Sequence, residues 1–204
     1  RRLAAGADEL TGTVTISAPP MLLSHLLLPC LRDLAADHPG LTLGLVGERR
    51  EADLGRAEAD IAVRLGRPSE PDLVMQPLGE ITYGLYGRQE AVNQPAADRV
   101  YIGFDDTMPS LPQKLWLDDH VAGRHFGLRS NDMGTMLQAA LGGFGIALLP
   151  DFLVRGHSQL IKLQEGDGAP VRPLFLVMHP DVRRSRRVRL VADKLRNMRD
   201  ELRN

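Results

Sequence analysis

Polar and charged residues stand at the ends of three segments that are predicted to be β-strands, and these residues could bind a small ligand. Ser17 ends the segment 12–17, Arg64 follows Ile61-Ala62-Val63, and Ser130-Asn131-Asp132 ends the segment 124–130. In open parallel sheets ligands bind outside the carboxyl ends of the strands, where the free N–H groups of the next helix favour anions. We therefore expect a binding cleft lined by these strand ends.

Arg64 is the residue of this set with the most specific chemistry. A guanidinium at a strand end can hold a ligand carboxylate through two parallel hydrogen bonds. A surface salt bridge to Glu58 or Asp60 is the alternative, because such pairs are common. Ser130, Asn131 and Asp132 have an alternative too, since these residue types also cap helices.

Two further clusters resemble known sites but lack their spacing. Asp118, Asp119, His120 and His125 are residue types that bind metals, yet their spacing fits no zinc signature, and a solvated loop is expected. The segment Gly142-Gly143-Phe144-Gly145 follows a helical pattern, so it predicts a helix terminator and not a phosphate loop. We expect no metal and no cofactor.

Nucleophilic catalysis has little support in the sequence. Cys30 lies in an apolar helical run five residues after His25, and no Gly-x-Ser-x-Gly motif occurs. Ser24 and His25 are adjacent and are expected to point in different directions from a helix. The expectation is that the protein is not an enzyme, although an enzyme on the same two-lobed fold stays open.

A basic run near the C-terminus could contact nucleic acid. It is interleaved with Asp193, Asp200 and Glu201 and has no aromatic residue for base stacking, so the solvated face of an amphipathic helix is favoured. The run comprises Arg183, Arg184, Arg186, Arg187, Arg189, Lys194, Arg196 and Arg199.

The elements that would position these residues alternate between strand and helix. Strands are predicted at 12–17, 41–47, 60–66, 101–104, 124–130, 145–150, 160–163 and 173–179, with extended chain over 73–87. Helices are predicted near 26–37, 51–59, 131–143 and 188–202. Pro29 is acceptable in the first of these helices if the helix begins only a few residues earlier. This order predicts an α/β protein with largely parallel sheets.

We expect two tandem α/β lobes joined by extended crossings near Thr82 to Gly87 and Leu174 to Pro180. Lobe I comprises 11–83 and 180–204, lobe II comprises 84–179, and residues 1–10 are the end of a linker. The final helix thus returns to lobe I.

Composition narrows the class of protein. The chain has 204 residues, 43% hydrophobic and 25% charged, with a formal net charge of -1, as in an ordinary globular protein. One cysteine forms no internal disulfide, and no run approaches the roughly 20 apolar residues that span a bilayer. A cytoplasmic protein without membrane association is expected.

Four segments in order resemble a known family. Strand-SAPP-helix with LLLP, then HPGLTLGLV, EADIAVRLGR and GGFGIALLPDFLV are similar to the effector-binding domain of LysR-type transcriptional regulators, from about Gly12 to about Met178. The resemblance implies a periplasmic-binding-protein-like (type II) fold of two Rossmann-like lobes with an effector cleft between them. It also implies an N-terminal winged helix-turn-helix that is absent from this chain, so that DNA is bound only through that absent domain.

The resemblance further implies which residues bind the effector and which form dimers or tetramers. The effector-binding loops correspond to Ser17, Ala18, Pro19, Pro20 and Met21; to Glu48 and Arg49; to Arg64, Leu65 and Gly66; and to Ser130, Asn131 and Asp132. Ala-Pro-Pro-Met replaces a more polar first loop of the family and favours a partly apolar effector. Oligomers would form through helices near Leu26–Ala36 and Met133–Leu141. A solute-binding protein of a transport system with the same fold is the alternative function.

Overall fold

The computed structural model describes residues 10–48, 59–69, 71–108, 110–198 and 202. It divides into two compact units, Arg1–Glu80 with Pro173–Asn204 (unit 1) and Ile81–Arg172 (unit 2), which are described separately. Each unit contains a five-stranded sheet with helices, so the predicted α/β class is confirmed. The predicted helix over 51–59 lies outside the described residues except for residue 59. Arg49 also lies outside them.

The sheet of unit 1 has the strand order β2-β1-β3-β10-β4. Its strands are β1 (Gly12–Ala18), β2 (Leu41–Gly47), β3 (Ile61–Leu65), β4 (Val74–Ile81) and β10 (Arg172–Met178). β1 pairs in parallel with both β2 and β3, as predicted. β10 is antiparallel to β3, with Leu174 opposite Leu65 and Val177 opposite Ala62. The chain was expected to cross from the second lobe back to the first over residues 174–180. Leu174 to Val177 already pair with β3 in the sheet of unit 1, so this crossing lies before Leu174.

The leucine-rich segment after β1 is one helical run with a wide turn inside it. α1 (Pro20–Leu22) continues into a π-helical segment, η1 (Leu23–Leu27), and then into α2 (Leu28–Asp37). The helical run thus starts nine residues before Pro29, earlier than expected. Pro29 lies in the first turn of α2, directly after the π-helical segment. The π-helical segment interrupts the regular α-helical hydrogen bonds at the place where proline, which has no N–H, cannot donate one.

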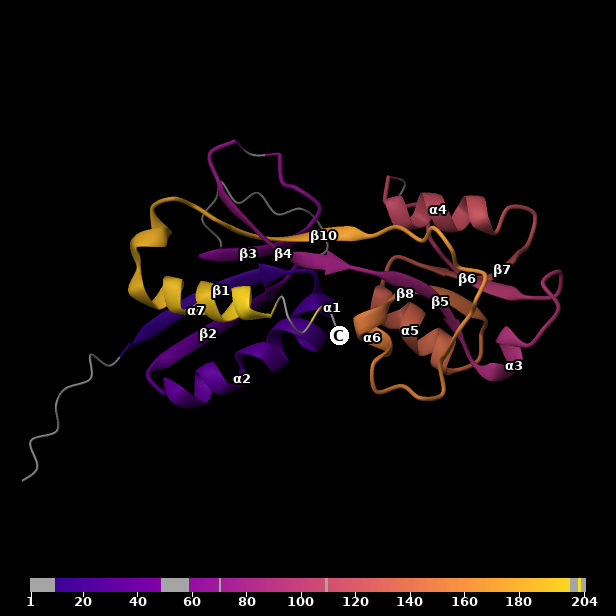
Figure 1. Ribbon diagram of the computed structural model, residues 1–204, viewed down its shortest axis with the longest axis horizontal. Helices are drawn as coiled ribbons and strands as arrows, with labels where there is room; N and C mark the ends of the chain where they lie inside the picture. The colour runs from indigo at the N-terminus through magenta and orange to yellow at the C-terminus, as the bar shows by residue number, and fades with distance from the viewer. Residues whose placement is uncertain (1–9, 49–58, 70, 109, 199–201, 203–204) are drawn as a thin grey trace, which may run out of the picture. The chain divides into compact units, whose positions relative to one another are not determined.

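Two helices of unit 1 pack against each other and against the sheet. α7 (Arg186–Asn197) follows a short 3₁₀ turn, η3 (Val182–Arg184), and contacts α2 and β1, while α2 also contacts β2 (Figure 1). The buried face of α7 consists of Val188, Val191, Ala192 and Leu195. Cys30 of α2 is buried in this contact, with its Sγ 3.6 Å from the carbonyl oxygen of Lys194. The helical spacing of the buried residues of α7 confirms the predicted amphipathic helix near the C-terminus.

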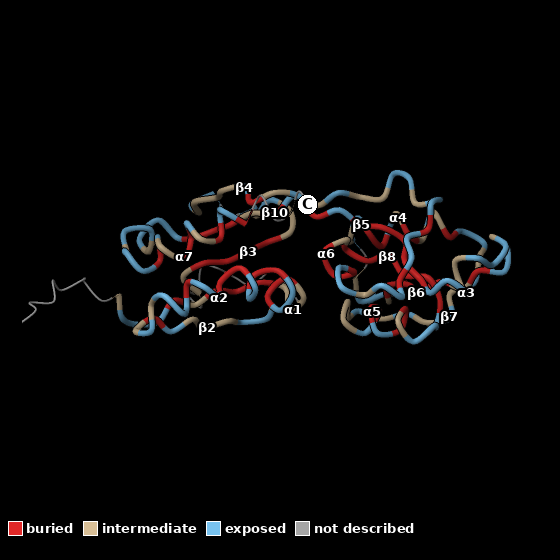
Figure 2. The backbone as a smooth tube through the Cα atoms, turned by 60° about the horizontal axis from the view of Figure 1, so that its bottom comes forward, coloured by how far each residue is buried: buried red, intermediate tan, exposed pale blue. Residues whose placement is uncertain are grey.

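The sheet of unit 2 has the order β7-β6-β8-β5-β9. Its strands are β5 (Tyr83–Gly87), β6 (Val100–Phe104), β7 (His125–Ser130), β8 (Ile146–Pro150) and β9 (Ile161–Lys162). β6 is parallel to β7 and β8, whereas β5 is antiparallel to β8 and β9. Buried backbone runs through β3 in unit 1 and through β8 in unit 2 (Figure 2), so the central strands form the cores.

Helices cover this second sheet on both faces. α4 (Pro112–His120) and α5 (Met133–Leu141) contact β6 from opposite sides (Figure 1), and two short helices, α3 (Gln89–Val92) and α6 (Asp151–Val154), complete the unit. α5 ends as predicted at the glycine pair. Gly143 has a φ of 81°, and the N–H of Phe144 donates to the carbonyl oxygen of Ala139 at 3.0 Å. This geometry is a Schellman cap.

None of the described helices has the length and apolar composition needed to cross a membrane.

Candidate functional site

A buried ion pair joins the carboxyl ends of three neighbouring strands in unit 1. Arg64 of β3 is 7% exposed, and its Nη2 lies 2.9 Å from Oε2 of Glu48, which follows β2. The same Nη2 donates to Oγ of Ser17 at 2.9 Å, and Nη1 donates to the Ser17 carbonyl oxygen at 3.0 Å and to that of Val63 at 3.1 Å. One guanidinium therefore fixes the ends of β1, β2 and β3 relative to one another.

Of the two surface salt bridges that the sequence left open as alternatives for Arg64, the structure tests only the one to Asp60, and its described residues do not contain that pair. The carboxylate of Asp60 instead accepts a hydrogen bond from the N–H of Thr15 at 2.8 Å, and Glu58 lies outside the described residues. Glu48 is a carboxylate partner of Arg64, and it is held in place because its N–H donates to the carbonyl oxygen of Ala18 at 3.0 Å. The order β2-β1-β3 brings these two residues together although sixteen positions separate them.

The predicted effector loop after β1 is only partly accessible in this structure. Ser17 is 1% exposed and Ala18 is fully buried, whereas Pro19, Pro20 and Met21 are half-buried. After β3, Leu65 and Gly66 are half-buried. Gly66 has a φ of 85°, which only glycine adopts readily, and its N–H donates to the carbonyl oxygen of Pro173 at 2.8 Å. The predicted binding roles of these residues stay predictions.

In unit 2 the predicted residues Ser130 and Asn131 lie next to the end of β6, which the sequence analysis did not identify as part of a site. The carbonyl oxygen of Ser130 accepts from the N–H of Asp105, which follows β6, at 3.2 Å. The side-chain amide of Asn131 donates to Oγ1 of Thr107 at 3.4 Å. Asp132 is the N-cap of α5, since its carboxylate accepts from the N–H of Thr135 at 2.8 Å, so the helix-cap alternative is confirmed for this residue.

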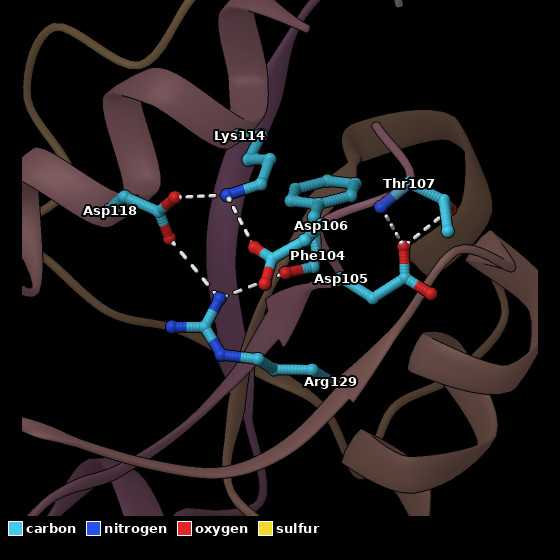
Figure 3. A network of polar contacts seen from close by, with 7 residues as sticks. All are labelled: Phe104, Asp105, Asp106, Thr107, Lys114, Asp118 and Arg129. Atoms are coloured by element: carbon cyan, nitrogen blue, oxygen red, sulfur yellow. Dashed lines mark hydrogen bonds and ion pairs between the residues drawn. The ribbon is translucent and has the colours of Figure 1, made fainter. Parts of the chain in front are cut away.

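Charged side chains surround the end of β6 (Figure 3). Lys114 of α4 is 8% exposed, and its Nζ lies 2.5 Å from Oδ2 of Asp118 and 3.8 Å from Oδ1 of Asp106. Arg129 of β7 places Nη1 3.6 Å from Oδ1 of Asp118 and 2.9 Å from the carbonyl oxygen of Phe104, to which it donates. Two cations and two carboxylates thus hold the β6 end against α4 and β7.

The sequence offered a weak signal for this network. Asp105, Asp106 and Thr107 directly follow the apolar segment Tyr101–Phe104, which is the pattern that identified the other strand ends. Lys114 had no such signal, because its burial results from the packing of α4 against β6.

The metal-like cluster is dispersed in the structure. Within the described residues no three His, Cys, Asp or Glu side chains lie together in a way that could hold a metal ion. Asp118 and His120 belong to α4, which corrects the expected loop; Asp118 pairs with Lys114, and His120 stacks on Trp116 with ring centroids 4.7 Å apart. Burial, followed by the charge of Arg124, lowers the pKa of His120.

Ser24 and His25 were expected to point apart, and this is wrong. Ser24 Oγ lies 2.8 Å from Nδ1 of His25, because both residues belong to the π-helical segment, where consecutive side chains are separated by a smaller rotation. Ser24 also donates to the carbonyl oxygen of Pro20 at 3.0 Å. In the described part of the chain no carboxylate orients the imidazole, so this exposed pair lacks the third group of a catalytic triad.

The carboxylate of Asp151, directly after β8, joins β5, β9 and Thr82, which lies just before β5. Asp151 accepts from Oγ1 of Thr82 and from the hydroxyl of Tyr86, both at 2.6 Å, and lies 3.3 Å from Nζ of Lys162. Burial alone would raise the pKa of Asp151, but the hydrogen bonds and the lysine charge together lower it. Burial, and then the hydrogen bond to Asp151, raise the pKa of Tyr86 above its usual range.

Similar proteins of known sequence are transcriptional regulators. The chain is 33% identical over 129 residues to the Mau operon transcriptional activator of Paracoccus denitrificans, covering 63% of this chain and 44% of that protein. It is 33% identical over 76 residues to an uncharacterised HTH-type transcriptional regulator of Escherichia coli K12, covering 37% of this chain and 25% of that protein. The chain thus spans less than half the length of these curated relatives.

Solved structures share the fold. The LysR-type regulator CrgA of Neisseria meningitidis matches with a TM-score of 0.77 at 23% identity, over 97% of this chain and 70% of that one. The effector domain of AmpR from Pseudomonas aeruginosa matches with a TM-score of 0.75 at 19% identity, over 94% and 98%. The fold is therefore the predicted periplasmic-binding-protein-like one. The family model described as the LysR substrate binding domain matches residues 7–200, and the chain belongs to that family.

Proposed function

We propose that this chain is the effector-binding and oligomerisation domain of a LysR-type transcriptional regulator. The observation that carries the proposal is the gathering of polar side chains at the carboxyl ends of parallel strands, at Ser17, Glu48 and Arg64 in unit 1 and at Thr107 and Asn131 in unit 2. Sheets of this kind bind ligands at those ends. DNA would be bound by a segment outside this chain, in keeping with the relatives, of which the chain spans less than half.

Within this proposal Arg64 also positions the effector loops. Its guanidinium donates to Ser17 and Glu48, so its hydrogen bonds are directed into the protein. The accessible groups of the first loop are then Pro19, Pro20 and Met21, which are apolar. A small molecule with an apolar body matches this loop of unit 1. In unit 2 the hydroxyl of Thr107 and the amide of Asn131 are groups that could bind a polar part of a ligand.

The proposed oligomer uses the two helices expected from the resemblance. Leu28, in the helix near Leu26–Ala36, is a large apolar side chain with 51% exposure. Phe144, directly after the helix Met133–Leu141, is 61% exposed. A dimer or tetramer formed through these helices would cover these two apolar side chains from water.

The remaining functional expectations follow from the proposal. A transcriptional regulator acts on DNA in the cytoplasm and needs no catalytic group, so we propose a cytoplasmic, non-enzymatic protein. The matched solved structures are regulators, which favours this function over a solute-binding protein of a transport system.

Ligand-induced thermal stabilisation tests the proposed effector site. The panel contains small carboxylic acids, with benzoate as a member with an apolar body and acetate as a member without one. A ligand at 100 times its Kd stabilises the protein by about 2.7 kcal/mol, and we expect benzoate-like members to raise the unfolding midpoint more than acetate. Asn131→Ala should reduce this stabilisation, and Asn93→Ala, at an exposed position after α3, should not. Equal stabilisation of both variants would exclude Asn131 from the site.

A further inference from the structure

Five arginines lie within seven residues at the start of the last helix. We call this set the arginine patch: Arg183, Arg184, Arg186, Arg187 and Arg189. The first two belong to η3 and the other three to the first turn of α7, and all five are exposed. The whole chain has a formal net charge of -1, so this concentration of positive charge is local.

The patch opposes the electrostatics of its own helix. The N-terminus of a helix carries a partial positive charge and favours acidic residues, each by about 0.3 to 1 kcal/mol. The first turn of α7 contains no acidic residue. The two acids nearest in sequence have other partners, since Asp181 lies 3.3 Å from Nδ1 of His179 and Asp193 pairs with Arg196. An anion bound to the exposed arginines would offset their repulsion by the helix N-terminus.

The position of the patch in unit 1 is fixed by one arginine. Arg187 Nε donates to the carbonyl oxygen of Thr13 at 3.2 Å, and its guanidinium lies over Gly12, where an added Cβ would be 3.7 Å from Cζ. The patch therefore lies at the start of β1, where the chain enters the unit (Figure 1). Ser17 is at the opposite end of β1, which at about 3.3 Å per residue is more than 10 Å away.

We propose that the arginine patch binds the phosphate backbone of duplex DNA, as a contact that carries no sequence preference. This rests on the proposed function, because a transcriptional regulator acts on DNA. The sequence leads to the expectation that DNA is bound only by a domain outside this chain. The proposed patch would be an additional DNA contact within the chain. Guanidinium groups pair with phosphate through two parallel hydrogen bonds.

Composition favours a duplex over a single strand. No Phe, Tyr or Trp follows Phe175 in the sequence, so the patch has no ring on which an unpaired base could stack. Single-strand binding relies on such stacking, whereas contacts to the duplex backbone rely on charge alone.

Fluorescence anisotropy of a labelled 30-bp duplex of random sequence tests the proposal on this chain. The patch variant is Arg183→Gln/Arg184→Gln/Arg189→Gln, which leaves Arg187 on Thr13. The matched control is Arg67→Gln/Arg88→Gln/Arg196→Gln, with the same loss of charge at exposed positions elsewhere. Three phosphate contacts contribute about -2.7 to the slope of log K against log salt, so a fourfold rise in salt weakens their binding about 40-fold.

We expect the wild-type chain and the control variant to bind with this salt dependence and the patch variant to lose most of it. Equal binding by the two variants, or no binding of the duplex by the wild type at low salt, would overturn the proposal. So would stronger binding to anionic phospholipid vesicles than to the duplex. Thermal stabilisation by benzoate, measured on the patch variant, separates the two proposals, because the patch lies away from the proposed effector loop. If carboxylic acids of the panel stabilise the chain but the duplex does not bind, only the proposal for the arginine patch is refuted. If the duplex binds but no acid of the panel stabilises the chain, the result counts only against the effector site.

Discussion

Replacing Arg64 by methionine should destabilise unit 1 strongly. The substitution keeps an unbranched side chain of similar length but removes the donors that bind Ser17, Val63 and Glu48. Breaking a buried ion pair by removing one partner costs about 3 to 5 kcal/mol. The Glu48 side chain is 16% exposed and can turn partly towards water, which places the expected loss of unfolding free energy at the lower end, about 3 kcal/mol.

The assay is thermal unfolding followed by two probes. For a chain of this size about 3 kcal/mol corresponds to a fall of about 6 to 12 °C in the unfolding midpoint, and circular dichroism monitors both units. Trp116 is the only tryptophan of the chain and belongs to α4, so its fluorescence reports on unit 2. The circular dichroism transition of Arg64→Met should move more than the fluorescence transition.

Two further variants isolate the ion pair from other effects. Arg196→Met removes a pair whose side chains are 43% and 61% exposed, and it should cost no more than about 0.5 kcal/mol. Glu48→Leu combined with Arg64→Met leaves no lone buried charge and should recover part of the loss. If Arg64→Met unfolded within about 0.5 kcal/mol of wild type, like the exposed control, the reasoning that this pair fixes the three strand ends would be refuted.

Two other predictions concern unit 2. The lowered pKa of Asp151 means that its contribution to stability is present above the ordinary value of 3.8 and is lost as the pH falls through the lower folded-state value; Asp151→Asn should abolish this acid-dependent part, measured as the unfolding midpoint against pH, and an unchanged profile would contradict it. Gly145→Ala should destabilise the unit, because the φ is 147° and an added Cβ would lie 2.5 Å from the carbonyl oxygen of Val100. Gly123→Ala, at a φ of 76° with nothing within 4 Å of its Cβ, is the control and should cost less; equal midpoints would show that the Val100 contact does not matter.

Local patterns in the sequence account for much of the fold. Alternation in the segments Gly12–Ala18 and Leu41–Gly47 identified strands, and the helical spacing of Val188, Val191 and Leu195 identified α7. Gly142 and Gly143 identified the end of α5, because glycine adopts the positive φ that a Schellman cap requires. These signals survive in the sequence because each depends only on neighbouring residues.

α4 was missed for a local reason as well. Gln113 and Lys114 are buried although they are polar, so the apolar period that marks a helix is absent from this segment. Its side chains satisfy their polar groups with partners from other elements, such as the Tyr83 hydroxyl, which accepts from Nε2 of Gln113 at 3.2 Å. The π-helical segment that accommodates Pro29 likewise has no simple signature.

The sequence by itself determined the α/β order, the strand ends at which polar residues occur, and the segments shared with the family. Only the tertiary structure decided which of those residues meet. Glu48 reaches Arg64 because β1 lies between β2 and β3, and Lys114 reaches Asp106 because α4 packs against β6. Such pairings depend on strand order and packing across many residues, and no local period of the chain encodes them.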